Sequence, residues 1–112
     1  MAVSEGKKNL PRILFVDDEK NILSALNRLF FDEDCELFLA NSGKEALKIL
    51  EKEEIPVIVS DQRMPGMSGV EFMVKAREIS PDSVRIILTG YTDMEAAMEA
   101  INRGQVYKFI TK

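Results

Sequence analysis

Histidine is absent from this chain of 112 residues, and cysteine occurs once, at Cys35. Without histidine the chain cannot form a serine–histidine or cysteine–histidine catalytic pair, a histidine-ligated zinc site or a phosphohistidine. A single thiol excludes an internal disulfide and any metal site built from several thiolates. We interpret Cys35 as a small, partly buried apolar residue, which is compatible with the reducing environment of the cytoplasm.

Long apolar runs and a basic surface are also lacking. Apolar stretches such as residues 13–16 are far shorter than the ~20 residues that cross a bilayer, so we predict no transmembrane segment. Residues 1–11 include Lys7 and Lys8 but no apolar core, which excludes a signal peptide and predicts a disordered tail before a domain over residues 12–112. Because the formal net charge is -4 and the basic residues are scattered, we expect no nucleic-acid binding by this chain.

Short apolar runs bounded by turn residues alternate with segments of helical periodicity. The first run, residues 13–16, is uniformly hydrophobic and is typical of a strand buried on both faces. Residues 36–40 are less uniformly apolar and predict a strand at the edge of a sheet. The five predicted strands cover residues 13–16, 36–40, 57–60, 85–88 and 106–110.

Helices are predicted between these strands. After Lys20, apolar residues recur at three- and four-residue spacing, which places them on one stripe that faces the core. Each later helix begins with a hydroxyl residue followed by glutamate three positions on, the pattern of a capping box, and ends near a proline or glycine. The stripe comprises Ile22, Leu23, Leu26, Leu29 and Phe30, the capping pairs are Ser42 with Glu45, Ser68 with Glu71 and Thr92 with Glu95, and the stops are Pro56, Pro81 and Gly104.

The alternation of strands and helices predicts parallel strands joined by right-handed crossovers, in a three-layer α/β sandwich. In such a fold the carboxyl ends of all strands lie along one edge of the sheet, where ligands bind. Side chains suited to metal or phosphoryl chemistry follow four of the strands. They are Asp17 and Asp18 after the first strand, Asp61 after the third, Thr89 after the fourth and Lys112 after the fifth.

Oxygen ligands without histidine or cysteine select a hard cation such as Mg²⁺ or Mn²⁺. A carboxylate such as Asp61 can also act as a nucleophile toward phosphorus and form an aspartyl phosphate. The Lys112 ammonium and the Thr89 hydroxyl would then contact the phosphoryl oxygens.

Each of these residues also has an ordinary structural interpretation. Asp17 or Asp18 can cap the following helix, and Asp61 can start the turn after its strand. Thr89 can be a turn residue, and Lys112 can be a solvated charge. For one residue alone the structural interpretation would prevail, whereas the placement of all of them at one edge favours a functional site.

With these residues identified, the sequence resembles the response regulator receiver domain from residue 13 to residue 112. The resemblance covers nearly the whole chain, and its motifs are specific. They are residues 13–19 (ILFVDDE), 57–69 (VIVSDQRMPGMSG), 86–90 (IILTG) and 107–112 (YKFITK).

The resemblance implies a role for each residue in these motifs. Asp18 would bind Mg²⁺ directly and Asp17 largely through water, while Asp61 would be both a ligand and the phosphoacceptor. The main-chain carbonyl of Arg63 would be the third protein ligand. Three further residues would respond to the phosphoryl group: Lys112 binds it, Thr89 is the switch hydroxyl and Phe109 is the aromatic residue whose rotamer changes the surface around the fourth helix and fifth strand.

The same resemblance implies a cytoplasmic signalling protein rather than an enzyme. A sensor histidine kinase or a phosphotransfer protein would donate the phosphoryl group, the output domain would lie outside this chain, and the altered surface would recruit a partner or form a homodimer. The fold would be flavodoxin-like, with strand order 2-1-3-4-5. Because receivers continue into a fifth helix and this chain stops at Lys112, we expect a domain that is truncated after the fifth strand.

Three other readings are weaker. A phosphohydrolase of the haloacid dehalogenase type would need Asp-x-Asp after the first strand, where Asp17 and Asp18 are adjacent instead. A flavodoxin-like carrier or nucleotide binder would need a glycine-rich phosphate loop there. The main alternative is a receiver-like interaction module that works without phosphorylation, and the complete acidic set with Thr89 and Lys112 argues against it.

Overall fold

The computed structural model describes residues 10–89 and 108–111. Several predicted features lie outside the described residues. These are residues 1–9 of the predicted tail, the Thr92 capping pair, the stop at Gly104, and Lys112.

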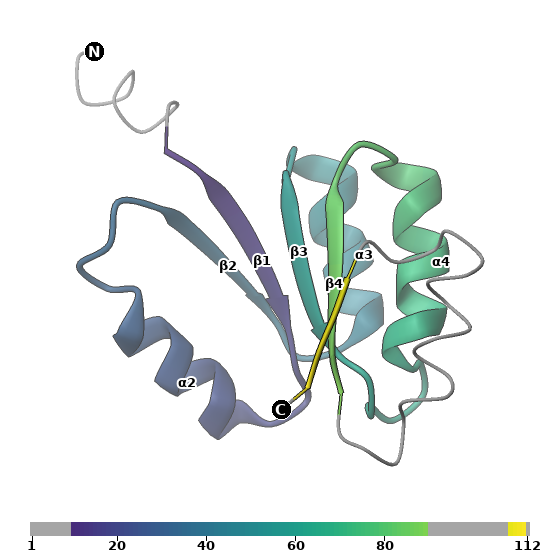
Figure 1. Ribbon diagram of the computed structural model, residues 1–112, viewed down its shortest axis with the longest axis horizontal. Coiled ribbons are helices and arrows are strands. Elements are labelled where there is room, and N and C mark those ends of the chain that lie inside the picture. The colour runs from purple at the N-terminus through teal and green to yellow at the C-terminus, as the bar shows by residue number, and fades with distance from the viewer. Residues whose placement is uncertain (1–9, 90–107, 112) are drawn as a thin grey trace.

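The described strands form one parallel sheet of five strands in the order β2-β1-β3-β4-β5, and the predicted order is therefore confirmed (Figure 1). Strand β2 lies at an edge of the sheet, as its mixed composition predicts. The strands are β1 (Arg12–Val16), β2 (Glu36–Ala40), β3 (Val57–Asp61), β4 (Val84–Thr89) and β5 (Lys108–Thr111).

Some strand boundaries differ from the predicted ones by a residue or two. Asp61 and Thr89 are the last residues of β3 and β4, whereas the apolar pattern predicts that they follow these strands. Strand β5 is described from Lys108 and extends to Thr111, one residue beyond the predicted end. The ladder hydrogen bonds with neighbouring strands decide these ends, and apolar periodicity does not report them.

The described helices are α2 (Lys20–Leu29), α3 (Gly43–Lys52) and α4 (Gly69–Ile79). The Ser42 Oγ accepts a hydrogen bond from the Glu45 amide at 3.1 Å, and Ser68 and Glu71 form the full capping box. The carboxylate of Glu45 accepts a hydrogen bond from the Asn41 amide, whereas the capping box predicts the Ser42 amide as its donor. Two of the three predicted helix starts are thus confirmed. In the described part of the chain, no helix is long and apolar enough to span a membrane.

The hydrophobic core lies between the sheet and helices α3 and α4, which lie together on one side in Figure 1. Its largest members have no exposed surface. Burying such side chains stabilises a fold by roughly 1.5–3 kcal/mol each, so this side of the sheet holds the domain together. Core members larger than alanine that have 0% exposure are Leu14, Ile58, Phe72, Met73 and Ile87.

The side of the sheet that faces α2 is less well covered. Helix α2 has no buried residue, and Leu29 is 69% exposed, so the prediction that the whole apolar stripe faces the core was wrong. Ile13 and Phe15 in β1 are only partly buried, so the prediction of burial on both faces was also wrong. Periodicity shows which residues share a face of a helix, but it does not determine how closely that face packs.

Candidate functional site

Three carboxylates from two neighbouring strands lie together at the carboxyl edge of the sheet. Asp17 and Asp18 follow β1 directly, and Asp61 ends β3, the strand that pairs with β1. One oxygen from each carboxylate lies within 4.8 Å of the others. Asp17 and Asp61 are buried, and Asp18 is exposed, so the cluster opens to solvent on one side.

Asp17 is held at the point where the chain leaves the sheet. Its amide donates to the Ala40 carbonyl of β2 at 3.1 Å, and its Oδ1 accepts from the Glu19 amide at 2.9 Å. Glu19 is the N-cap of α2 and makes no side-chain capping bond. The Asp17 carboxylate therefore shapes the turn before the helix.

The backbone around Asp61 is held by strand β4 and by the side chain of Ser60 in β3. The Gln62 amide donates to the Leu88 carbonyl of β4 at 3.1 Å, and the Ser60 Oγ donates to the Asp61 carbonyl at 2.9 Å. A Cβ atom added at Gly69, the first residue of α4, would lie only 2.5 Å from the Asp61 carbonyl oxygen. Helix α4 can approach Asp61 this closely because residue 69 is glycine.

The loop of residues 62–68 joins β3 to α4 and contains Arg63. The Gly69 amide donates to the Gln62 carbonyl at 2.9 Å, and the Val70 amide donates to the Gln62 Oε1 at 3.0 Å. Within the loop Gly66 has a φ of 81°, a backbone conformation that favours glycine. Gln62 and Gly69 belong to the motif of residues 57–69, but no role was predicted for either of them.

The three carboxylates suit a hard divalent cation. All the side-chain donors are oxygens, the set preferred by Mg²⁺. Like charges at this separation repel one another, and a cation between them offsets that repulsion. The donor chemistry and spacing of Asp17, Asp18 and Asp61 therefore fit the predicted Mg²⁺.

Of the other predicted site residues, Thr89 lies in β4 and Phe109 in β5. Thr89 ends β4 at the same edge of the sheet and pairs with Thr111 of β5, and Phe109 pairs with Ile87. The side chains of Thr89 and Phe109 lie outside the described part of the structure, as does Lys112. Arg63 is exposed in the loop after Asp61.

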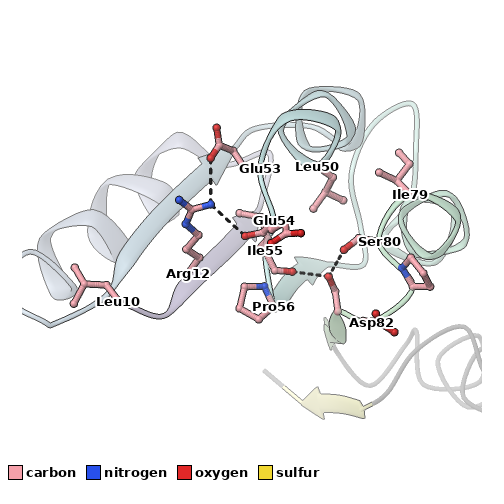
Figure 2. Close-up of a pocket in the computed structure, with 12 residues that line it drawn as sticks. Leu10, Arg12, Leu50, Glu53, Glu54, Ile55, Pro56, Ile79, Ser80 and Asp82 are labelled. Carbon is pink, nitrogen blue, oxygen red and sulfur yellow. Dashed lines mark hydrogen bonds and ion pairs between the residues drawn. The ribbon is translucent and has the colours of Figure 1, made fainter. Parts of the chain in front are cut away.

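A cavity of about 690 Å³ lies at the end of the sheet where β1, β3 and β4 begin, opposite the end that carries the three carboxylates (Figure 2). Arg12 Nη1 donates to Glu53 Oε1 at 3.3 Å and to the Glu54 carbonyl at 3.4 Å, and the Ser83 Oγ donates to the Ile55 carbonyl. These lining groups bind one another, and none of them belongs to the predicted site. The cavity therefore lies apart from the carboxylate cluster.

Comparison with known proteins identifies the family to which this chain belongs. The family description "response regulator receiver domain" matches residues 13–112. The hydrogenase transcriptional regulatory protein HoxA of Cupriavidus necator is 41% identical over 100 residues, which are 89% of this chain and 20% of that protein. This chain thus spans about a fifth of the length of that curated relative.

Two solved structures are also similar. A structure described as an adenylate cyclase from Rhodopirellula baltica has 48% identity and a TM-score of 0.86, covering 92% of this chain and 76% of that one. The response regulator protein TrrA of Thermotoga maritima, in complex with Mg²⁺ and BeF, has 31% identity and a TM-score of 0.78, covering 92% of this chain and 87% of that one.

Proposed function

Because the chain belongs to the family of response regulator receiver domains, we propose that it is a phosphorylation-activated signalling domain whose phosphoacceptor is Asp61. The observation that carries this proposal is the cluster of Asp17, Asp18 and Asp61 at the carboxyl edge of the sheet. Of the three carboxylates, Asp61 is the one that ends the central strand β3.

Asp17, Asp18, Asp61 and the main-chain carbonyl of Arg63 would hold the metal ion, Mg²⁺ or in its place Mn²⁺. The bound ion would supply positive charge to the oxygens of the phosphoryl group during transfer. The Mg²⁺ and BeF bound by TrrA support this assignment by similarity.

The reaction would be a displacement at phosphorus. A carboxylate oxygen of Asp61 attacks the phosphorus of a phosphohistidine donor, the new O–P bond forms, and the P–N bond to the donor histidine breaks. Lys112 would bind the phosphoryl oxygens. Thr89 would donate a hydrogen bond to them, and Phe109 would then change its rotamer and alter the surface around β5 and the helix that is predicted to begin after Thr92.

The partners follow from this chemistry. A sensor histidine kinase or a phosphotransfer protein would supply the phosphoryl group in the cytoplasm, where the lone Cys35 stays reduced. The altered surface would act on an output domain outside this chain or form a homodimer. The domain would therefore transmit a signal rather than act as an enzyme on a metabolite.

Intact-mass spectrometry after incubation with acetyl phosphate and Mg²⁺ tests the proposal. We expect one phosphoryl adduct on the unaltered chain, none on Asp61→Asn, and none when a chelator removes the metal. Asp82→Asn is a matched control, because Asp82 is exposed and lines the cavity at the opposite edge of the sheet. A folded chain that takes no adduct would contradict the proposal and favour the phosphorylation-independent interaction module.

A further inference from the structure

We infer that Gln62 is a positioning residue, whose side chain holds the loop after Asp61 in the geometry that the metal site requires. This inference rests on the proposed function. It concerns a residue that follows the phosphoacceptor directly and contributes no metal ligand itself.

Three hydrogen bonds fix Gln62. Its amide donates to the Leu88 carbonyl at 3.1 Å, its carbonyl accepts from the Gly69 amide at 2.9 Å, and its Oε1 accepts from the Val70 amide at 3.0 Å. One residue thus connects the end of β3, the end of β4 and the start of α4, which lie together at one end of the sheet (Figure 1).

The side chain of Gln62 completes the capping of α4. The first amides of a helix have no partner within it. The capping box accounts for the Glu71 amide, which donates to the Ser68 Oγ, and for the Ser68 amide, which donates to the Glu71 carboxylate. The amides of Gly69 and Val70 both donate to Gln62, so this residue supplies the acceptors that the capping box leaves out.

These contacts close the loop of residues 62–68 at its two ends. Gln62 binds Gly69 through its backbone and Val70 through its side chain, so the end of β3 and the start of α4 are held to each other. Arg63, whose main-chain carbonyl is a proposed metal ligand, is the residue that follows Gln62. Ligands that are held in advance bind a metal more tightly, because less ordering is needed when it binds.

Gln62→Met tests the inference. Methionine resembles glutamine in size and lacks the amide oxygen, so the Val70 amide loses its acceptor. We expect the dissociation constant for Mg²⁺, measured by isothermal titration calorimetry on the unphosphorylated chain, to rise roughly tenfold. We also expect slow labelling by acetyl phosphate at low Mg²⁺ and recovery of the rate when Mg²⁺ is saturating.

Two further variants separate positioning from a loss of stability. Gln62→Glu keeps the acceptor, and at high ionic strength, where its added charge is screened, it should recover most of the Mg²⁺ affinity. Ser42→Ala removes a capping bond of the same kind from α3, so it should lower the melting temperature without changing the Mg²⁺ affinity. An unchanged affinity in Gln62→Met, or an equal loss in Ser42→Ala, would overturn the inference.

Hydrogen exchange in the unaltered chain tests the contact itself, even if Gln62→Met does not fold. We expect the Val70 amide to exchange slowly, as the amides inside α4 do, and fast exchange would overturn the inference. An unaltered chain that binds no Mg²⁺ and takes no adduct would contradict the proposed function together with the inference. Normal labelling of the unaltered chain, with full Mg²⁺ affinity in Gln62→Met, would contradict the inference alone.

Discussion

Gly43 and Gly69 each begin a helix, yet their surroundings differ in a way that predicts different tolerance to alanine. A Cβ at Gly69 would lie 2.5 Å from the Asp61 carbonyl oxygen, which belongs to the backbone of β3. A Cβ at Gly43 would lie 2.6 Å from the Met67 Sδ, near the end of a flexible side chain. A methionine side chain can change rotamer, whereas a strand within a sheet cannot move freely.

We therefore expect Gly69→Ala to lower the free energy of unfolding by about 1–3 kcal/mol, the usual cost of overpacking. It should also slow the labelling of Asp61, because helix α4 has to move away from this residue. Gly43→Ala should change the free energy of unfolding by less than about 1 kcal/mol, since alanine also favours the helix. Urea denaturation measures both, and equal losses would contradict the argument.

At the scale of elements, the capping box of α4 couples the stability of this helix to pH. The pKa of Glu71 is lowered from the ordinary value of 4.5, first by the hydrogen bond from the Ser68 amide and then by the Ser68 side chain. A carboxylate whose pKa is lowered on folding stabilises the fold at neutral pH, and this stabilisation is lost as the pH falls through the lowered pKa.

Glu71→Gln should therefore lower the melting temperature at neutral pH and have a smaller effect in acid, because protonation removes the same charge from the unaltered chain. Thermal melts from neutral pH to about pH 3 measure the difference between the two chains. Glu78→Gln, near the other end of α4, controls for the loss of one negative charge from the helix. A constant difference across this pH range would show that the charge of Glu71 is not involved.

At the scale of the whole molecule, the two sides of the sheet contribute unequally to stability. Phe72 lies in the core between the sheet and helices α3 and α4 and has 0% exposure. Phe31 follows α2 on the other side and is 81% exposed. The two residues have the same side chain, so they form a matched pair.

Phe72→Ala should lower the free energy of unfolding by about 3–5 kcal/mol, because it removes buried contacts and leaves a cavity. Phe31→Ala should change it by less than about 0.5 kcal/mol, as is usual for exposed positions. Chemical denaturation of the two variants under the same conditions measures both values. A loss of several kcal/mol in Phe31→Ala would mean that the α2 side is covered in solution.

Much of this fold could be predicted from the sequence, because its elements depend on local patterns. Apolar runs and capping pairs involve residues that are close along the chain, so they predicted the strands and two of the described helix starts. The parallel arrangement follows from the alternation of strands and helices. It was enough to predict that Asp17, Asp18 and Asp61 lie at one edge. The roles of these residues, like those of Thr89, Phe109 and Lys112, stay predictions.

Tertiary structure alone decided the contacts between elements. The bonds from Gln62 to Leu88 and Val70, and the close approach of Gly69 to Asp61, depend on where α4 lies against the sheet. The 69% exposure of Leu29 likewise depends on how α2 packs against the sheet. Local sequence does not encode such distances, because they result from the packing of all side chains between two elements at once.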